Sequence, residues 1–490
     1  MNNLAVLPII LPLIAGFIIA FTNKKPTVSR FLSKIFIVIN LMSVIYITYI
    51  IFNGNPIILE TGSWEAPYGI IFVADSLSIV LVLTTNILAL ACIFIAPYLV
   101  SERKEKFYFY TFIFFLISGV SGAFLTGDLF NLFVFFEVLL MASYGLIVLG
   151  GDKKQLRESL KYVLINLFSS VVFVTTVAFL YAVVGTVNMA HIAERVHEVE
   201  QQGVLTAIGI VLFFVFATKA ALFPLYYWMP KSYVVPNPVV SALFGALLTK
   251  VGIYSIIRVF TLIFVFESDL IRTFFLIIAA LSMLFGVIGA ISTNNVKLII
   301  AYNVIPSIGF ILFGLAIFNQ TALSGSVYYL VHDMVIKAAL FLIVGVLTYL
   351  AGTSDLRKMG GLLHIYPGLG WMLFIAIFVL AGIPPFSGFI GKLLLLKGSF
   401  EAEHIPVLII ALISSLLILY SVMRIFIQAF WGEKPVIQKK ASFGMYVPII
   451  FLLSISVILG IQAEFFNTHI QEVAQYLLDP EIYIKLVLKE

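Results

Sequence analysis

The sequence predicts an all-α polytopic membrane protein with about 14 transmembrane helices. Of its 490 residues, 62% are hydrophobic and only 11% are charged, whereas soluble domains carry about 25% charged residues. The mean hydropathy is +1.13. The apolar stretches are each close to the roughly 17 to 25 residues that a helix needs to cross a bilayer. A lipid bilayer is therefore the expected surrounding of nearly the whole chain.

About fourteen apolar stretches follow one another along the chain, each placed to within several residues. The loops between them are too short for a water-soluble domain, since the longest, around Asn188 to Gln202 and Gly352 to Gly368, have only about 15 residues. The tail after Glu464 is expected to form at most one or two short surface helices. The stretches begin near Leu4, Leu32, Phe72, Phe107, Leu129, Tyr162, Thr206, Pro238, Arg272, Leu298, Ser324, Leu369, Ile405 and Phe443.

The basic residues of the loops predict the orientation of the chain. Cytoplasmic loops of membrane proteins carry an excess of lysine and arginine. The loops after even-numbered stretches hold chiefly Arg195 and Arg272, so both termini are predicted on the outer face. The loops after odd-numbered stretches hold 16 basic residues, namely Lys24, Lys25, Arg30, Arg103, Lys104, Lys106, Lys153, Lys154, Arg157, Lys231, Lys297, Arg357, Lys358, Lys434, Lys439 and Lys440.

The seventh stretch, Ile208 to Tyr233, places a lysine and a proline inside an apolar segment. A charge at mid-bilayer costs about 2.5 to 3.5 kcal/mol on insertion scales, so Lys219 is expected to face the bundle interior. Pro224 cannot donate to the carbonyl of Ala220 and is expected to break the helix beside the charge. The alternative is a kink with a snorkelling lysine, but about 13 residues, roughly 20 Å, precede Lys219 in the span.

The twelfth stretch repeats this pattern with Pro384, Pro385 and Lys392. The seventh and twelfth stretches are five apart and cross the membrane in opposite directions, as two inverted five-helix repeats would require. Chance recurrence of prolines is the alternative. The predicted division is residues 1–106 for helices 1 to 3, 107–260 for the first repeat, 261–432 for the second, and 433–490 for helix 14 and the tail.

Six titratable residues are predicted to lie deep within the spans. Burial and mutual repulsion disfavour the charged form of lysine, so some of the lysines are expected to be neutral at physiological pH. Lysines that gain and lose protons in sequence, with a histidine that titrates near neutrality, would form a proton relay. The candidates are Glu137, Lys219, Lys250, His332, Lys337 and Lys392.

Each candidate also has a structural interpretation. His332 is equally consistent with a core histidine bonded to a backbone carbonyl, and its neighbour Asp333 could orient it or face water. Lys250 and Lys337 could form a structural pair with a carboxylate that the sequence does not reveal. Glu137 and Lys219 could form a resting ion pair that is itself the switch, because breaking a buried pair is expensive.

Other polar and aromatic residues are expected to have structural roles. Asp75 and Asp128 lie at the ends of spans, where caps and turns are expected. Arg424 lies near the inner face, where snorkelling is expected. Trp228, Trp371 and Trp431 fall near cytoplasmic ends, as an aromatic belt predicts.

Several classes of function have no support in the sequence. The single cysteine, Cys92, lies in an apolar span, which excludes a disulfide or a cysteine-based metal cluster within this chain. No Ser/His/Asp set, phosphate-binding loop or cofactor-binding domain is predicted, and the excess of basic residues is explained by the loops rather than by nucleic acid. The expected energy source is an ion gradient or a partner subunit.

Five segments together resemble one family of membrane proteins. They are F-V-A-D-S-L-S from Phe72, T-G-D-L-F-N-L-F-V-F-F-E-V-L-L-M-A-S-Y from Thr126, F-A-T-K-A-A-L-F-P-L-Y-Y-W-M-P from Phe216, D-L-R-K-M-G-G-L from Asp355 and G-I-P-P-F-S-G-F-I-G-K from Gly382. These segments are similar to those of the antiporter-like membrane subunits shared by respiratory complex I and the multisubunit Mrp (Mnh) cation/proton antiporters. The resemblance covers nearly the whole chain.

The resemblance implies a fourteen-helix fold with two inverted five-helix repeats and a hydrophilic axis. It also implies which positions form that axis. Complex I members often carry a histidine after the proline of the seventh span, where this chain has Tyr226 and Tyr227, which favours the antiporter branch. The implied axis positions are Glu137, Lys219, Lys250, Lys337 and Lys392.

The resemblance further implies a plasma-membrane subunit that moves protons within a multisubunit Na⁺/H⁺ antiporter. H⁺ and Na⁺ are the implied ions, other membrane subunits are the implied partners, and no cofactor is implied. Two alternatives remain open. The same module could belong to a quinone-reducing NADH dehydrogenase or hydrogenase complex, or the chain could be a stand-alone transporter, which would need a polar substrate pocket.

Overall fold

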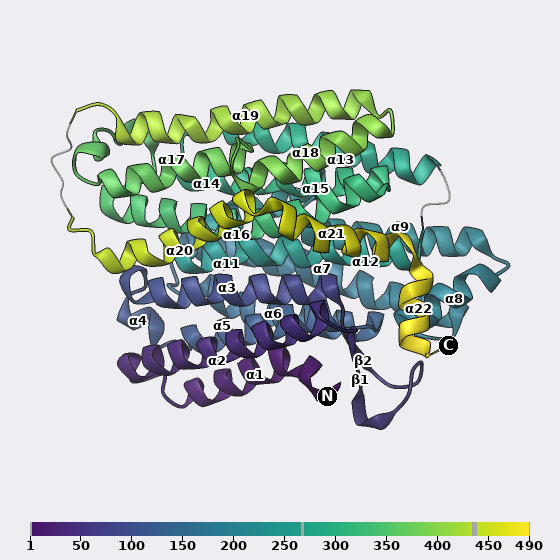
Figure 1. The fold of residues 1–490 in the computed structure, drawn as a ribbon. Helices are drawn as coiled ribbons and strands as arrows, with labels where there is room; N and C mark the ends of the chain where they lie inside the picture. Colours follow the sequence, from purple (N-terminus) through teal and green to yellow (C-terminus); the bar gives the residue numbers. More distant parts are fainter. Residues whose placement is uncertain (1, 266–268, 434–438, 490) are drawn as a thin grey trace.

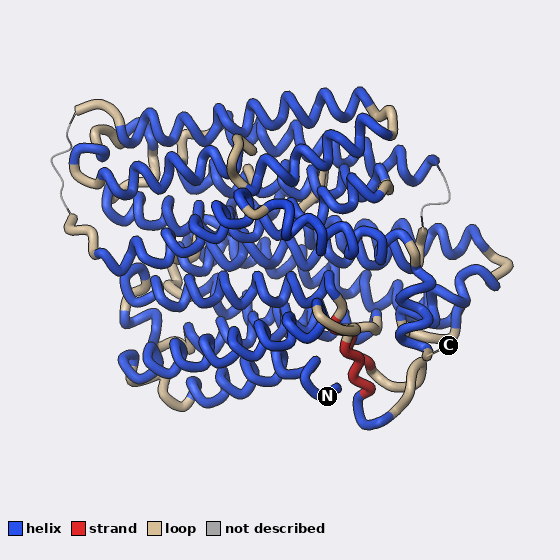
Figure 2. Tube along the Cα trace, viewed as in Figure 1, coloured by secondary structure: helices blue, strands red, loops and turns tan. Residues whose placement is uncertain are grey.

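The computed structural model of the chain describes residues 2–265, 269–433 and 439–489. Figures 1 and 2 show a bundle of helices that run side by side, with one small β-hairpin at the same end of the bundle as the C-terminus. The predicted class, a helical polytopic membrane protein, is confirmed.

The first half of the bundle contains one β-hairpin and the helices up to the middle of the chain. The hairpin consists of β1 (Ile57–Glu60) and β2 (Ile71–Ala74). The helices are α1 (Leu7–Ala20), α2 (Pro26–Phe52), α3 (Ser76–Leu99), α4 (Glu102–Glu105), α5 (Phe109–Leu125), α6 (Leu129–Val148), α7 (Lys153–Val184), α8 (Met189–Arg195), α9 (Gln202–Ala220), α10 (Met229–Val234), α11 (Pro238–Leu243) and α12 (Thr249–Leu262).

A π-helical turn, Phe244–Leu248, joins α11 to α12 in the first half. The regular elements of the second half are helices among its described residues. The helices are α13 (Asp269–Ser292), α14 (Val296–Tyr302), α15 (Val304–Ile317), α16 (Gln320–Ala351), α17 (Pro367–Ala381), α18 (Ser387–Glu401), α19 (Ile405–Phe430), α20 (Phe443–Ile461), α21 (Ala463–Leu478) and α22 (Pro480–Leu488).

Twelve helical segments among the described residues are long and apolar enough to cross a membrane. Two shorter apolar helices, α5 and α17, lie where the fourth and twelfth spans were predicted. Every predicted apolar stretch therefore coincides with a helix. The number of crossings, fourteen, stays a prediction.

The β-hairpin is a departure from the all-helical prediction. Its strands pair antiparallel, with Ile57 opposite Ala74, so the third span does not begin near Phe72 but at Ser76. The helix starts there because Asp75 caps it: the Asp75 carboxylate accepts the Ser78 N–H at 2.8 Å, and the Ser78 hydroxyl accepts the Asp75 N–H at 3.0 Å. The predicted capping role of Asp75 is confirmed.

Helix α16 lies at the centre of the bundle (Figure 1). It packs against α3, α11, α15, α17, α18, α20 and α21. The close approach to α18 depends on Gly325, where a Cβ atom would lie 2.7 Å from the backbone nitrogen of Leu395. Because neighbours surround this helix, its charged residues are shielded from both water and lipid.

The seventh span is broken as predicted, and the break begins before the proline. Helix α9 ends at Ala220, and Ala221 takes a left-handed conformation with φ of 60°. The Leu222 N–H then bonds back to the Ala217 carbonyl at 3.0 Å. After Pro224 the chain forms one 3-10 turn and restarts as α10.

The twelfth span ends its first helix in the same way. Helix α17 stops at Ala381, Gly382 has φ of 83°, and the Ile383 N–H bonds to the Phe378 carbonyl at 3.1 Å. A glycine suits this position because it adopts positive φ at no steric cost. The chain restarts as α18, so the breaks predicted at Pro224, Pro384 and Pro385 are confirmed.

A pair of loop contacts recurs in the two halves of the chain. Asp128, which begins the fifth span, forms an antiparallel bridge with Asn188, and Asn295, which begins the tenth, forms one with Asp355. Asn295 follows Asp128 by the same number of residues as Asp355 follows Asn188. All four side chains accept backbone N–H groups at the starts of helices or turns. This recurrence supports the inverted repeat, which stays a prediction.

The C-terminal tail forms two helices, the upper number predicted. The first, α21, continues from α20 along the bundle (Figure 1) and packs against α16. Its inner face buries Ile470, Val473, Ala474 and Leu477. The second helix, α22, packs against α8. The tail therefore covers the centre of the bundle.

A buried ion pair that the sequence does not reveal joins α2 to α4. The Arg30 guanidinium donates three hydrogen bonds of 2.6 to 3.0 Å to the Glu105 carboxylate, which also accepts the Tyr110 hydroxyl at 2.8 Å. The Glu105 side chain is fully buried. Glu102 also approaches Arg30, at 3.6 Å, but its side chain is 68% exposed.

Replacing Glu105 with alanine is expected to destabilise the protein by roughly 2 to 3 kcal/mol, because Arg30 and Tyr110 lose their buried partner. The matched variant Glu102→Ala should cost less than about 1 kcal/mol, since exposed pairs contribute little. The measurement is the thermal unfolding midpoint of the purified assembly. Equal effects of the two variants would contradict this account of the Glu105 site.

Candidate functional site

A row of charged side chains lies inside the bundle. The fractional exposure is 3% for Lys219, 5% for Lys392 and 0% for Lys250, Asp333 and Lys337. Removing charges from water is costly unless they are paired or hydrogen-bonded. Each buried charge therefore has to be explained by the groups around it.

Asp333 lies between two of the lysines. Its Oδ2 is 2.7 Å from the Lys250 ammonium, and its Oδ1 is 3.4 Å from the Lys337 ammonium. Lys337 follows Asp333 by one helical turn of α16, which puts both on one face, whereas Lys250 reaches across from α12. The sequence had suggested that Asp333 orients His332 or faces water. The structure shows instead that Asp333 is the carboxylate shared by Lys250 and Lys337.

The π-helical turn before α12 provides a second partner for Lys250. The Gly245 carbonyl accepts the Lys250 ammonium at 2.8 Å, and such turns often occur at functional sites. A Cβ atom at residue 245 would lie 2.2 Å from the Phe341 ring, so only glycine allows α16 to approach here. No sequence signal predicted this turn.

Lys392 lies on α18, and its ammonium reaches the break between α17 and α18. Its ammonium donates to the Leu380 carbonyl at 3.2 Å, the Ala381 carbonyl at 2.8 Å and the Ser415 hydroxyl at 2.7 Å. The two carbonyls belong to the last turn of α17, where they have no partner within the helix and where the helix dipole favours a cation. The break therefore creates the binding site for the lysine.

His332 links α16 to the start of α18. Its Nδ1 lies 2.8 Å from the Ser387 hydroxyl, which in turn lies 2.8 Å from the Ser456 hydroxyl of α20. This contact differs from the backbone carbonyl that a core histidine was expected to use. Its Nε2 is buried without a hydrogen-bond partner among the described residues. His332 and Lys337 face different neighbours, because residues five apart are offset by about 140° around a helix.

Lys219 lies in the last turn of α9. Its ammonium donates to the Ser170 hydroxyl at 3.2 Å and lies over the Phe136 ring, 4.7 Å from the centroid. Among the described residues no ion pair within 4.0 Å joins it to Glu137, so the resting pair considered from the sequence is not formed.

Helix α12, which carries Lys250, packs directly on this last turn of α9. A Cβ atom at Gly252 would lie 2.8 Å from the Lys219 carbonyl carbon.

Glu137 has a different environment from the lysines. It is only partly buried, on a face of α6 that also exposes Val134 and Met141. Its Oε1 is buried and has no hydrogen-bond partner among the described residues. With Asp333 included, this row of candidate residues holds four lysines against two carboxylates, where the sequence had given four lysines and Glu137 alone.

A second buried ion pair was missed at the sequence level. Asp75, the cap of α3, also contacts Arg258 of α12 at 2.5 Å. The Arg258 guanidinium lies over the rings of Tyr254 and Tyr483, 5.6 and 5.2 Å from their centroids. No sequence signal joins residues so distant in the chain. Arg258 therefore connects the Asp75 cap of α3 to the tail helix α22.

The Arg424 guanidinium donates to the carbonyls of Ile291 and Thr293 at the end of α13, and its snorkelling stays a prediction. One structural role, that of Trp228, differs from the prediction. Trp228 is buried and donates to the Thr218 carbonyl at 3.1 Å, so it is not part of an aromatic belt, whereas Trp371 and Trp431 are exposed as predicted. Asp128 caps α6 by accepting the Asn131 N–H, as expected.

No group of three or more histidine, cysteine or acidic residues suited to a metal ion occurs among the described residues. The candidate residues instead form four contact sets spread over both halves of the chain. They are Lys219 with Ser170, the trio Lys250, Asp333 and Lys337, His332 with Ser387, and Lys392 with the carbonyls of Leu380 and Ala381. A helical membrane protein with such titratable groups in its interior belongs to the class of ion-translocating membrane proteins.

Comparison with known proteins identifies the family within that class. A family model described as "NADH:quinone oxidoreductase/Mrp antiporter, TM" matches residues 126–418. The D-type Na⁺/H⁺ antiporter subunit of Alkalihalophilus pseudofirmus is 48% identical over 493 residues, covering 100% of both chains. The chain therefore belongs to the NADH:quinone oxidoreductase/Mrp antiporter family, which confirms the resemblance seen in the sequence.

Two solved structures share the fold. A chain in the structure of the Mrp complex from Dietzia sp. superposes with a TM-score of 0.94 at 27% identity, covering 99% of both chains. A chain of respiratory complex I from Thermus thermophilus superposes with a TM-score of 0.84 at 22% identity, covering 97% of this chain and 100% of that one. The complex I likeness shows the fold alone.

Proposed function

We propose that this chain is the proton-translocating subunit of a multisubunit Na⁺/H⁺ antiporter, a transporter subunit rather than an enzyme. Its full-length relative in Alkalihalophilus pseudofirmus is named as one subunit of a Na⁺/H⁺ antiporter. The observation that carries the proposal is the buried trio in which Asp333 lies between Lys250 and Lys337. A carboxylate shared by two lysines can hold one proton more or fewer with little movement of the side chains.

The proposed relay passes through the contacts of the trio Lys250, Asp333 and Lys337 and extends to the other candidate residues on either side. A proton passes from the Lys219 region, where α9 meets α12, to Lys250 and then across Asp333 to Lys337. It continues through His332 to Lys392 at the break between α17 and α18. At each step one group loses the proton that the next group gains, so the interior charge is conserved. In this proposal the Glu137 carboxylate favours the protonated form of Lys219 electrostatically, without forming an ion pair with it.

The surroundings of the chain follow from the same assignment. It is a multi-pass protein of the plasma membrane, and other membrane subunits complete the antiporter. The basic loops support an orientation with both termini on the outer face. The proposed division into residues 1–106, 107–260, 261–432 and 433–490 separates the N-terminal helices, the two repeats, and helix 14 with the tail.

The redox-complex alternative has less support. The likeness to complex I is confined to the fold, and Tyr226 and Tyr227 stand where complex I members often carry histidine. In that alternative the same relay would be driven by a redox arm held by other subunits. Purification of this chain with a soluble redox arm would favour it.

Antiport in everted membrane vesicles tests the proposed function. The chain is expressed with and without its partner subunits, and collapse of a proton gradient on addition of Na⁺ is followed. Activity is expected only when the partners are present. Activity of the chain alone would indicate a self-sufficient transporter, and no activity in either case would favour the redox complex.

A further inference from the structure

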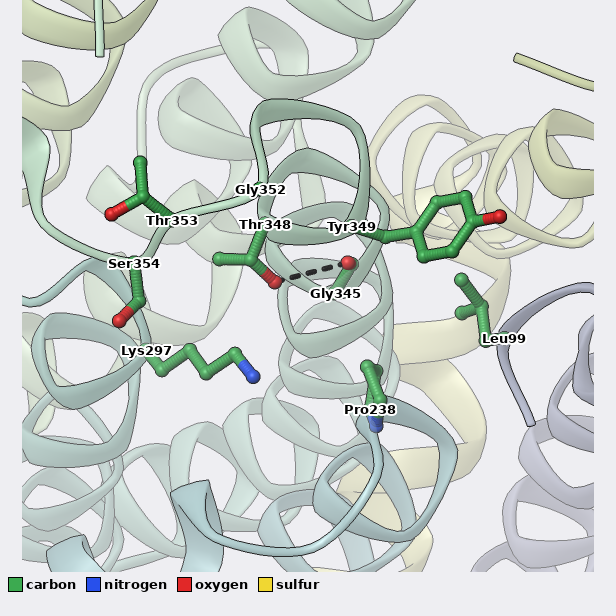
Figure 3. A pocket seen from close by; sticks show the side chains of 9 residues that line it. All are labelled: Leu99, Pro238, Lys297, Gly345, Thr348, Tyr349, Gly352, Thr353 and Ser354. Atoms are coloured by element: carbon green, nitrogen blue, oxygen red, sulfur yellow. Dashed lines mark hydrogen bonds between the residues drawn. The ribbon is translucent and has the colours of Figure 1, made fainter. Parts of the chain in front are cut away.

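A cavity of about 310 Å³ opens at the end of the bundle that carries the basic loops. Figure 3 shows its lining, which comes from α3, α11, α14, the last turns of α16 and the segment that follows. The lining residues are Leu99, Pro238, Lys297, Gly345, Thr348, Tyr349, Gly352, Thr353 and Ser354. This cavity takes no part in the relay.

Lys297 is the charged residue of the cavity. Its side chain extends among the lining residues, with the nitrogen below Thr348 and Gly345 in Figure 3. No carboxylate lies within 4.0 Å of its ammonium in the part of the chain that the structure describes, and the charges that act on it are those of Lys104 and Lys154, both positive. The cavity is therefore an electropositive site without an internal counter-ion.

The Thr348 hydroxyl of the cavity already donates to the Gly345 carbonyl at 3.1 Å, whereas the Thr353 and Ser354 hydroxyls have hydrogens left to donate. The Ser354 oxygen already accepts the Asn295 side-chain amide at 3.0 Å, and the Thr353 oxygen accepts the Asp355 N–H at 3.2 Å. The Thr353 and Ser354 hydroxyls can each still donate a hydrogen. A ligand with acceptor atoms and a negative charge fits these two hydroxyls together with the Lys297 ammonium, which repels a cation.

The position of the cavity indicates where such a ligand comes from. It lies at the cytoplasmic end in the proposed orientation, next to Tyr349, which is 43% exposed, and Leu99. Lys439 lies over the Tyr349 ring, 4.7 Å from its centroid, and adds a further positive charge. Basic pockets between membrane helices on this side bind anionic lipid headgroups.

We propose that this cavity binds the phosphate of an anionic phospholipid of the inner leaflet, with Lys297 as the main contact. The headgroup would join the ends of α3, α11, α14 and α16. The lipid would then stabilise the end of the helix that carries Asp333 and Lys337. This proposal does not depend on the proton relay.

Hydrogen exchange of the purified, lipid-depleted complex tests the proposal. Phosphatidylglycerol, phosphatidylcholine or inorganic phosphate is added, and exchange is followed in peptides that cover residues 345–354. Phosphatidylglycerol is expected to slow exchange there more than the other two, because ligand binding suppresses local opening. Equal protection by phosphatidylcholine, or by millimolar phosphate, would overturn the assignment to an anionic lipid.

Two variants make the test specific to the site. Lys297→Gln is expected to weaken phosphatidylglycerol binding about five-fold, the effect of one lysine beside an anionic headgroup. Lys358→Gln, an exposed residue at the same end of the bundle, should leave binding unchanged. Unchanged protection in Lys297→Gln would also overturn the proposal. If Lys297→Gln fails to assemble, the proposal is still tested by comparing hydrogen exchange of the native complex with phosphatidylglycerol, phosphatidylcholine and inorganic phosphate.

Discussion

Replacing Asp333 with alanine is expected to abolish Na⁺-dependent proton exchange and to destabilise the protein by roughly 3 to 5 kcal/mol. The variant leaves Lys250 and Lys337 buried, both without their shared carboxylate, and an uncompensated buried charge carries this cost. The measurements are antiport in vesicles and the amount of assembled complex in the membrane. Glu401→Ala, at an exposed ion pair with Lys397, is the control and should change neither.

The double variant Asp333→Asn with Lys250→Met separates the relay from a purely structural pair. With all three groups ionised, the trio carries one net positive charge in the native protein, and Lys337 alone carries it in the double variant. Assembly is therefore expected to recover relative to Asp333→Ala, while antiport stays at least ten-fold below native. Recovery of antiport together with assembly would mean that the trio only supports the fold.

The fold was largely predictable because its constraints are local. The lengths of the apolar stretches and the prolines at Pro224, Pro384 and Pro385 are enough to place the spans and the two breaks. The hairpin before α3 was missed because β2 is as apolar as the span it precedes. The cap at Asp75, a local signal, marks the true start of that helix.

The site was predictable in its members but not in its pairing. Lys219, Lys250 and Lys337 are recognisable as buried candidates because their distance from the start of each span, at about 1.5 Å per residue, places them deep in the membrane. The four-residue spacing of Asp333 and Lys337 was a readable signal that both lie on one face. The contact between Lys250 and Asp333 joins two separate helices, and a π-helical turn precedes Lys250. No local sequence pattern predicts either the contact or the turn.

The expected pair between Glu137 and Lys219 shows why matching charges along a sequence is insufficient. Glu137 lies on a partly exposed face of α6, while Lys219 is directed to Ser170 and the Phe136 ring. An aromatic face and a hydroxyl thus take the place of the expected carboxylate. Which partner a flexible lysine meets depends on helix rotation, and the sequence sets that rotation only through packing.

Lys219→Met is expected to reduce antiport at least ten-fold without weakening the fold. The lysine is buried, donates one hydrogen bond and has no ion-pair partner within 4.0 Å among the described residues. Its replacement by an apolar side chain of similar length removes a desolvated charge, which is often neutral or stabilising. The thermal midpoint of the complex should therefore hold or rise while proton exchange falls.

Two further variants complete this test. Lys231→Met, on the exposed surface of α10 in the same span, is the matched control and should retain native antiport. Glu137→Gln should lower antiport with little change in the thermal midpoint, because no ion pair is broken. Native antiport in Lys219→Met would remove Lys219 from the relay. A fall in the thermal midpoint of Lys219→Met as large as that of Asp333→Ala would instead show that Lys219 supports the fold. Antiport and the thermal midpoint together therefore separate proton transfer from packing at Lys219.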